Sequence, residues 1–169
     1  MKKTIGLVAL VAFSFIVYAG GNPEFVPFPA DYKEKFTRYH SQNRANNEQV
    51  ADMYANDIAV QSARSGKLAD GSVVIMEIYK PAVDEEGKPV SDSNGMFRKD
   101  KLAAVAVMER RSEWSAEFPE SDRAGGWGFA IYDPSGNPKE NDLECAACHT
   151  PLANQEFMFT YSKLASHAE

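Results

Sequence analysis

The chain has 169 residues, with 24 acidic and 18 basic side chains and a formal net charge of −6 at pH 7. That length is enough for one domain with a sizeable hydrophobic core. The acidic balance argues against nucleic acid as a partner, because binding to phosphates requires the opposite charge. Its plainest consequence is a soluble surface.

Residues 1–19 have the pattern of a secretory signal peptide. Two lysines give a positive start, residues 5–17 are largely apolar, and Ala19 precedes a turn-like Gly-Gly-Asn-Pro sequence. We expect cleavage after Ala19, which leaves residues 20–169 as a single domain. The removed segment holds two of the 18 basic residues and none of the 24 acidic ones, so the mature net charge is −8. An uncleaved anchor is the alternative, but a spanning helix needs about 20 apolar residues.

The first element of the mature chain is predicted to be a helix. Tyr32, Phe36 and Tyr39 recur at helical spacing, and Asp31 stands before them as a capping residue. We expect this helix to end in the polar stretch 41–47.

The next segment, residues 48–55, fits either a helix or a short strand. A second helix is predicted over residues 57–65, because Asn56 is a favourable N-cap and Gly66 a favourable stop.

Strands dominate the middle of the chain. Ser112 is expected to cap a short helix that runs towards Phe118, and residues 157–161 form an aromatic run of either strand or helix. The chain is therefore predicted to be an α+β domain, mainly an antiparallel β-sheet with flanking helices. The three segments with the β-branched and apolar composition of strands are 72–80, 102–109 and 127–132.

The motif Cys-Ala-Ala-Cys-His at residues 145–149 is the attachment pattern of c-type haem. Two thiols add to the porphyrin vinyl groups, and the adjacent imidazole binds the iron. We therefore predict one covalent haem c, held by Cys145, Cys148 and His149. The alternative is a redox-active or structural Cys-x-x-Cys that is followed by an incidental His149. Both cysteines of the chain lie in the motif, so no disulfide is expected, and export agrees with haem attachment outside the bacterial cytoplasm.

The iron's sixth position decides between two kinds of function. A second protein ligand favours electron transfer, whereas an open position favours binding of a diatomic ligand or chemistry. We expect His40 and His167 to be surface residues. Among the five methionines of the mature chain, Met76 lies in the middle of a predicted strand, a rigid place from which to present a sulfur atom. The others are Met53, Met96, Met108 and Met158.

Several short motifs, in this order and approximate spacing, together resemble the cytochrome P-460 and cytochrome c-prime-beta family. The resemblance implies a mostly antiparallel β fold, a homodimer and a periplasmic location. It also implies that His149 is the proximal ligand and that Cys145 and Cys148 form the thioether links. The motifs are Phe28–Tyr32, Asp70–Val74, Gly125–Phe129, and Cys145–His149 followed by Phe157–Phe159.

Two departures from the hydroxylamine-oxidising members of that family follow from the alignment. Their porphyrin-crosslinking lysine corresponds to Met76, and their distal carboxylate corresponds to Ala104. Lys80 does not replace the lysine, because four residues along a strand span roughly 13 Å. Without the acid, no group is placed to take protons from a substrate.

The resemblance makes Met76 a candidate distal ligand, with a pocket-lining residue as the alternative. Trp127 and Phe129 are candidate haem contacts or ordinary core residues, and Arg110 and Arg111 are candidate propionate partners or an exposed strand end. Further pocket candidates are Val74, Ile78 and Ala104.

The leading hypothesis is a periplasmic electron-transfer cytochrome with a redox partner protein and no stable membrane anchor after cleavage. The second is a protein that binds nitric oxide. Hydroxylamine oxidation is the minor alternative, so the chain is not expected to be an enzyme.

Overall fold

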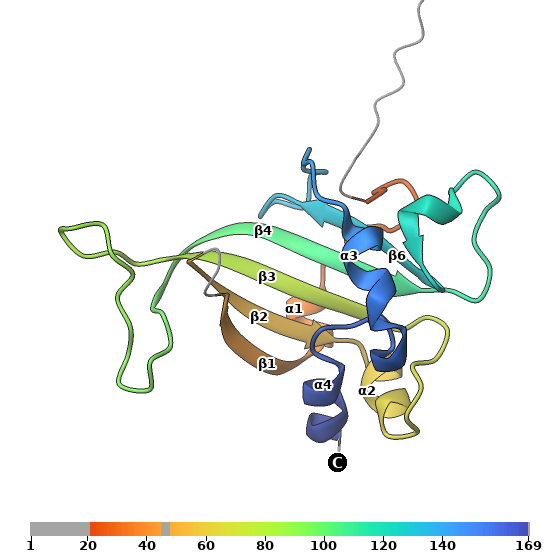
Figure 1. Cartoon of the computed structure of the whole chain (residues 1–169), viewed down its shortest axis with the longest axis horizontal. Helices are drawn as coiled ribbons and strands as arrows, with labels where there is room; N and C mark the ends of the chain where they lie inside the picture. The colour runs from red at the N-terminus through yellow and green to blue at the C-terminus, as the bar shows by residue number, and fades with distance from the viewer. Residues whose placement is uncertain (1–20, 45–47, 169) are drawn as a thin grey trace, which may run out of the picture.

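A computed structural model describes residues 21–44 and 48–168, and one six-stranded sheet organises them. The predicted signal peptide, residues 1–19, lies outside these ranges. The strand order is β1-β2-β3-β4-β6-β5, and every neighbouring pair is antiparallel (Figure 1). This sheet confirms the predicted α+β class. The strands are β1 (Thr37–Arg44), β2 (Gln49–Ala55), β3 (Val73–Pro81), β4 (Lys99–Arg110), β5 (Arg123–Ala124) and β6 (Trp127–Tyr132).

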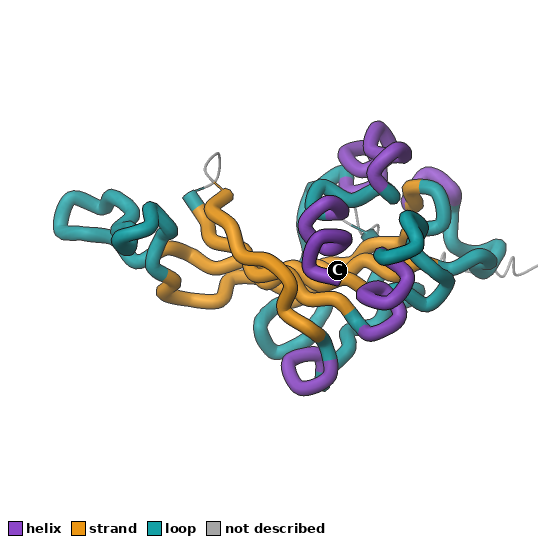
Figure 2. The backbone as a smooth tube through the Cα atoms, turned by 90° about the horizontal axis from the view of Figure 1, so that it is seen from below, coloured by secondary structure: helices purple, strands orange, loops and turns teal. Residues whose placement is uncertain are grey.

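Short helices cover both faces of the sheet. Figure 2 shows α3 and α4 on one side and α1 on the other. None of the helices within the described ranges is long and apolar enough to cross a membrane. The helices are α1 (Tyr32–Lys35), α2 (Asp57–Ala63), α3 (Cys145–His149) and α4 (Tyr161–Ala168), with two 3₁₀ helices, η2 (Glu120–Asp122) and η3 (Thr150–Gln155).

The predicted strands and the predicted second helix are present. Asn56 caps α2 as expected, since its Oδ1 accepts a hydrogen bond from the Ala59 backbone N–H at 3.0 Å. The same oxygen accepts from Val73 N–H at 3.1 Å, and the side-chain amide donates to the Gly71 carbonyl at 2.9 Å. One capping residue therefore also fixes the start of β3 against the start of α2.

The predicted helix from Tyr32 to the polar stretch is wrong after Lys35. The chain leaves the helix at Phe36 and continues as the edge strand β1. Tyr32 packs on one face of the sheet and Tyr39 on the other, so their helical spacing did not reflect a shared face. Pairing with β2 prevailed over the local pattern, and it also makes the ambiguous segment 48–55 a strand.

The predicted helix after Ser112 is also absent. The Ser112 hydroxyl donates to Asp70 at 3.0 Å, and the Trp114 indole N–H donates to the Gly126 carbonyl at 2.9 Å. These long-range bonds hold the segment as a loop. The aromatic run at 157–161 is neither strand nor helix until Tyr161, where α4 begins.

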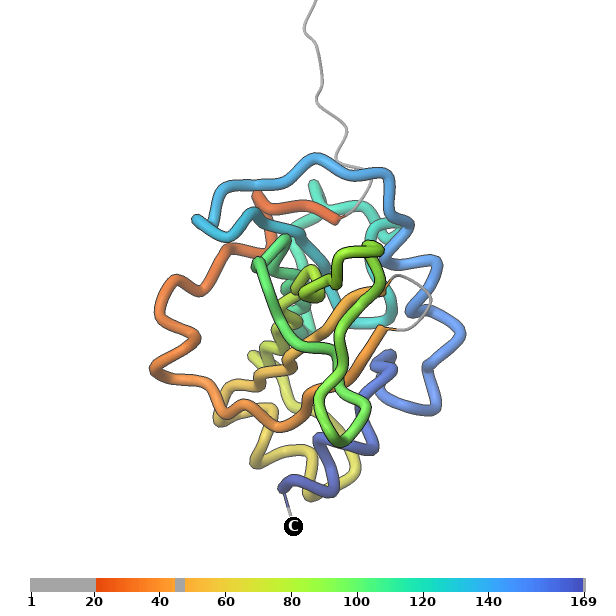
Figure 3. Tube along the Cα trace, turned by 90° about the vertical axis from the view of Figure 1, so that its left-hand side faces the viewer, coloured from red at the N-terminus to blue at the C-terminus, as the bar shows by residue number. Residues whose placement is uncertain are grey.

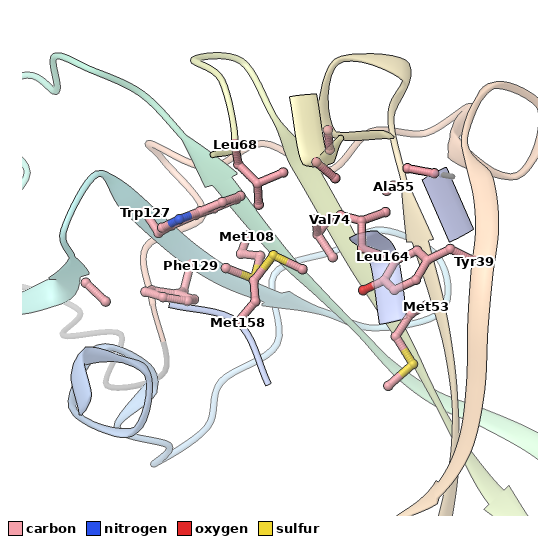
Figure 4. Packing of buried hydrophobic residues seen from close by; sticks show 14 of the residues in the cluster. Tyr39, Met53, Ala55, Leu68, Val74, Met108, Trp127, Phe129, Met158 and Leu164 are labelled. Carbon is pink, nitrogen blue, oxygen red and sulfur yellow. The ribbon is translucent and has the colours of Figure 1, made fainter. Parts of the chain in front are cut away.

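The two faces of the sheet have different surroundings. Along β3, Val74 and Met76 point to the side of α3 and α4, whereas Ile75 and Glu77 point to the other side, as the period of two in a strand requires. The N-terminal segment with α1 covers that second face. Figure 4 shows the first side, where Met53, Val74, Met108, Phe129 and Met158 come together from five parts of the chain.

The connection between β3 and β4 projects beyond the sheet as a long loop (Figures 1 and 3). Asn43 of β1 ties this loop to the sheet: its side-chain N–H donates to the Gly95 carbonyl and its oxygen accepts from Phe97 N–H, each at 2.8 Å. The loop is therefore anchored beside the end of β1.

Candidate haem-binding site

Helix α3 carries the Cys-x-x-Cys-His motif at one edge of a cavity. Cys145 and Cys148 are three residues apart on this single turn, so their side chains share a face of the helix. Both thiols are free, and both line the cavity together with His149. The helix contacts β5 and β6, which places the motif near one edge of the sheet.

The cavity has a volume of about 560 Å³ and lies against the sheet face that carries Met76. Its wall is mainly apolar. The apolar side chains in the wall are Met53 of β2, Val74, Met76 and Ile78 of β3, Ala106 and Met108 of β4, Phe129 and Ile131 of β6, and Leu143, Met158 and Phe159 of the C-terminal segment.

His149 is held so that one of its nitrogens is free. Its Nδ1 lies 2.6 Å from the Phe157 carbonyl oxygen. Because a carbonyl only accepts, Nδ1 carries the proton, and Nε2 retains the lone pair that a metal needs. Burial lowers the pKa of His149 below its ordinary value and favours the neutral ring. The ring also contacts Phe129, with 4.8 Å between centroids, and Phe159, with 5.1 Å.

The Phe157 carbonyl is presented by an unusual backbone. Glu156 and Phe157 have φ angles of +52° and +59°, in the left-handed region that side chains other than glycine rarely adopt. The Glu156 carboxylate accepts a hydrogen bond from the Leu68 N–H at 3.0 Å, which ties this turn to the loop before β3. The contact compensates for backbone strain at the residue that orients His149.

The family model described as cytochrome P-460 matches residues 29–160, which is most of the chain. The chain belongs to the cytochrome P-460 family. No curated protein matches it. Cytochrome P-460 proteins bind haem, and the cavity fits this group: two thiols on one helical turn, an imidazole with a free nitrogen, and an apolar wall.

More methionines line the cavity of this cytochrome P-460 than the sequence predicted. Met53, Met76, Met108 and Met158 all line the wall. Met53 is directly opposite Met76 in the pairing of β2 with β3, so their Cβ atoms are expected about 5 Å apart. The sequence did not point to Met53, because its segment fitted a helix as well as a strand. Coordination by Met76 stays a prediction.

The two predicted aromatic contacts occupy different places. Phe129 lines the cavity and packs on His149. Trp127 is fully buried beside Leu68 and Met158 in Figure 4, and it is not among the residues that form the cavity wall. The structure therefore gives Trp127 a place in the core behind the site.

No lysine lines the cavity among the described residues, and the nearest carboxylate on β3 faces away from it. Glu77 is fully buried on the opposite face of the sheet, where it accepts from Tyr32 at 2.6 Å, Tyr79 at 2.8 Å and Lys33 at 2.8 Å. Burial raises the pKa of Glu77, but these donors outweigh it and lower the pKa overall. Glu77 is thus a structural anion, separated from the cavity by the sheet.

The arginines predicted as propionate partners do not reach the cavity wall. Arg111 is bonded to Glu109 at 2.8 and 3.0 Å, and its guanidinium lies 4.5 Å from the Trp114 ring centroid. Arg110 lies beside Gly126. The arginine that does line the cavity is Arg44 of β1, in the polar stretch where the sequence predicts the end of a helix.

Replacing Glu156 with alanine is expected to weaken the hydrogen bond that orients His149, because the strained turn loses its anchor on Leu68. In a Met76→Leu background, where the ferrous haem is expected to be five-coordinate, resonance Raman spectra should show a lower iron–histidine stretching frequency. The free energy of unfolding should fall by about 1–3 kcal/mol, since a buried backbone N–H is left unpaired.

Glu156→Gln keeps an acceptor oxygen and should preserve most of the frequency, and alanine at the exposed Glu113 is the matched control. An unchanged iron–histidine frequency in Glu156→Ala would show that the turn is held by other contacts.

Proposed function

We propose that the chain is an exported, periplasmic c-type cytochrome that holds one covalent haem and carries electrons. In this proposal Cys145 and Cys148 form the thioether links, His149 is the proximal ligand and Met76 the distal ligand. The observation that supports it is a single cavity lined by all four side chains. The family membership supports haem as the occupant.

A bound haem supplies an iron that changes oxidation state by one electron. The protein's part is to keep the surroundings of the iron the same in both oxidation states. The Phe157 carbonyl fixes the tautomer of His149, and the rigid strand β3 presents the Met76 thioether from mid-strand. The wall around Met76 is mainly apolar and offers few partners for water. Two fixed axial ligands favour electron transfer over ligand chemistry.

Nitric oxide binding is the second candidate function. The wall near Met76 is made of small and apolar side chains, among them Val74, Ile78 and Ala106. A thioether is a weak iron ligand that a diatomic gas can displace, so this function is compatible with electron transfer. Oxidation of hydroxylamine is disfavoured, since no lysine lines the cavity within the described residues, and the carboxylate in its wall, Glu144, comes from the segment before α3 and not from a strand of the sheet.

The partners of this cytochrome are proposed from its charge and family resemblance. The formal net charge, −6 for the full chain and −8 once residues 1–19 are removed, favours a basic redox partner protein. A homodimer is proposed from the resemblance to the family.

Optical spectra of the purified haem protein in both oxidation states test the electron-transfer proposal. The expected ferric spectrum is low-spin, with the weak far-red band of methionine ligation. A high-spin, five-coordinate ferric spectrum would exclude Met76 as a stable ligand. Nitric oxide added to the ferrous protein tests the second function, which predicts a six- or five-coordinate nitrosyl spectrum without denaturant.

A further inference from the structure

Strand β1 contributes two polar side chains to a wall that is otherwise mainly apolar. Gln42 and Arg44 both line the cavity. Among the lining residues that the structure describes, Arg44 is the one lysine or arginine. Glu144, an acidic residue of the same wall, immediately precedes α3 at the other side of the cavity.

Arg44 is half-buried without an acidic partner in the described part of the chain. Its Nη1 donates to the neutral Gln49 side-chain oxygen at 2.8 Å, which orients the guanidinium. Burial lowers the pKa of Arg44, a sign that its charge is poorly solvated. Partly buried arginines are normally paired with an anion, because desolvation of an unpaired charge is costly.

Gln42 adds neutral donors on the same side of the cavity. Its side-chain oxygen lies 3.3 Å from the His40 Nε2 atom. That contact engages the oxygen and leaves both N–H groups of the amide for another acceptor. Gln42 and Arg44 are two residues apart on one strand, so their side chains share a face.

The position of β1 relative to α3 identifies the anion. Helix α3 contacts β5 and β6, whereas β1 is the edge strand at the far side of the sheet. In haem, the two vinyl groups lie on one half of the macrocycle and the two propionate carboxylates on the other. A haem attached through its vinyl groups to Cys145 and Cys148 would therefore direct its propionates away from α3, towards β1.

We propose that Arg44 and Gln42 form a carboxylate-binding site for a haem propionate. The guanidinium fork and the amide N–H groups supply planar donors that match a carboxylate. The site rests on the haem of the proposed function, but it assigns residues and an orientation which that function does not require.

The test compares Arg44→Gln and Arg44→Lys with the wild-type haem protein by resonance Raman spectroscopy and redox titration. In Arg44→Gln the propionate bending modes should shift, and the reduction equilibrium should move about tenfold towards the ferric form, which is about 59 mV for one electron. The direction follows because a nearby cation stabilises the reduced haem. In Arg44→Lys the reduction potential should stay close to that of the wild type, because the positive charge is kept. The propionate bending modes should still shift, because lysine is a point charge without the planar fork of arginine.

Glutamine at Arg64, an exposed residue just after α2, is the control for loss of one positive charge and should leave both measurements unchanged. Gln42→Leu is a second variant that keeps the charge, and its propionate modes should also shift.

Unchanged propionate modes in both Arg44→Gln and Gln42→Leu overturn the site. So does a shifted carbon monoxide stretch with unchanged propionate modes, which would place Arg44 beside the distal ligand. Wild-type protein without covalent haem would overturn the proposed function as well, so the two failures are distinguishable.

Discussion

Replacing both Cys145 and Cys148 with alanine is expected to abolish covalent haem in the purified protein. The two thiols are the only cysteines of the chain, and both line the cavity that the haem is proposed to fill. Intact-protein mass spectrometry should show the mass of the mature polypeptide alone. Each single variant should keep one thioether link and lose part of its haem during expression.

The double variant should also be much less stable than the wild-type haem protein. Loss of the haem leaves a cavity of about 560 Å³, and residues that the group would cover, such as the 63% exposed Phe159, stay in water. A group that packs into the cavity only in the folded state stabilises that state, and the thioether links keep the haem at a high effective concentration beside its cavity. Haem that survives denaturation in the double variant would contradict the attachment proposed here.

Replacing Met76 with leucine is expected to convert the ferric haem from low-spin to high-spin. Leucine has a similar volume without the sulfur atom, so the cost in folding free energy should stay below about 1.5 kcal/mol. The far-red band should disappear, and the ferrous protein should bind nitric oxide faster, because no thioether has to leave. Absorption spectra and stopped-flow mixing measure these changes.

Met53→Leu is the matched control for this experiment. Met53 lies directly opposite Met76 in the sheet and lines the same cavity, and it is 3% exposed. The expected spectrum is unchanged. If Met53→Leu loses the far-red band while Met76→Leu keeps it, the distal ligand is Met53, and the proposed electron-transfer function stands with a different sulfur.

Much of the sheet followed from composition alone. The segments that became β3, β4 and β6 are β-branched, apolar and bounded by turn residues, so local preference and tertiary structure agree there. The opposite happened at β1. Its residues are polar, and Tyr39 continued a helical spacing by chance, so the strand depends on hydrogen bonds to β2 rather than on its own propensity.

The candidate site shows the same contrast between residues that local sequence reveals and residues that only tertiary contacts bring in. Cys145, Cys148 and His149 were recognisable because their chemistry depends on local spacing within one helical turn. Gln42, Arg44 and Met53 were not, because each belongs to a segment whose strand character was unclear from the sequence. Met76 lay in an unambiguous strand and therefore stood out among the methionines.

The amino-acid sequence by itself determined the class of fold, and it was enough to predict covalent haem and the three side chains that would hold it. All of these depend on neighbours a few residues apart, where covalent geometry and the strand period set the outcome. The tertiary structure decided which methionines meet across β2 and β3, that Arg44 rather than Arg110 or Arg111 enters the cavity, and that Glu77 is turned away from it. Strand register sets these contacts between residues far apart in the chain.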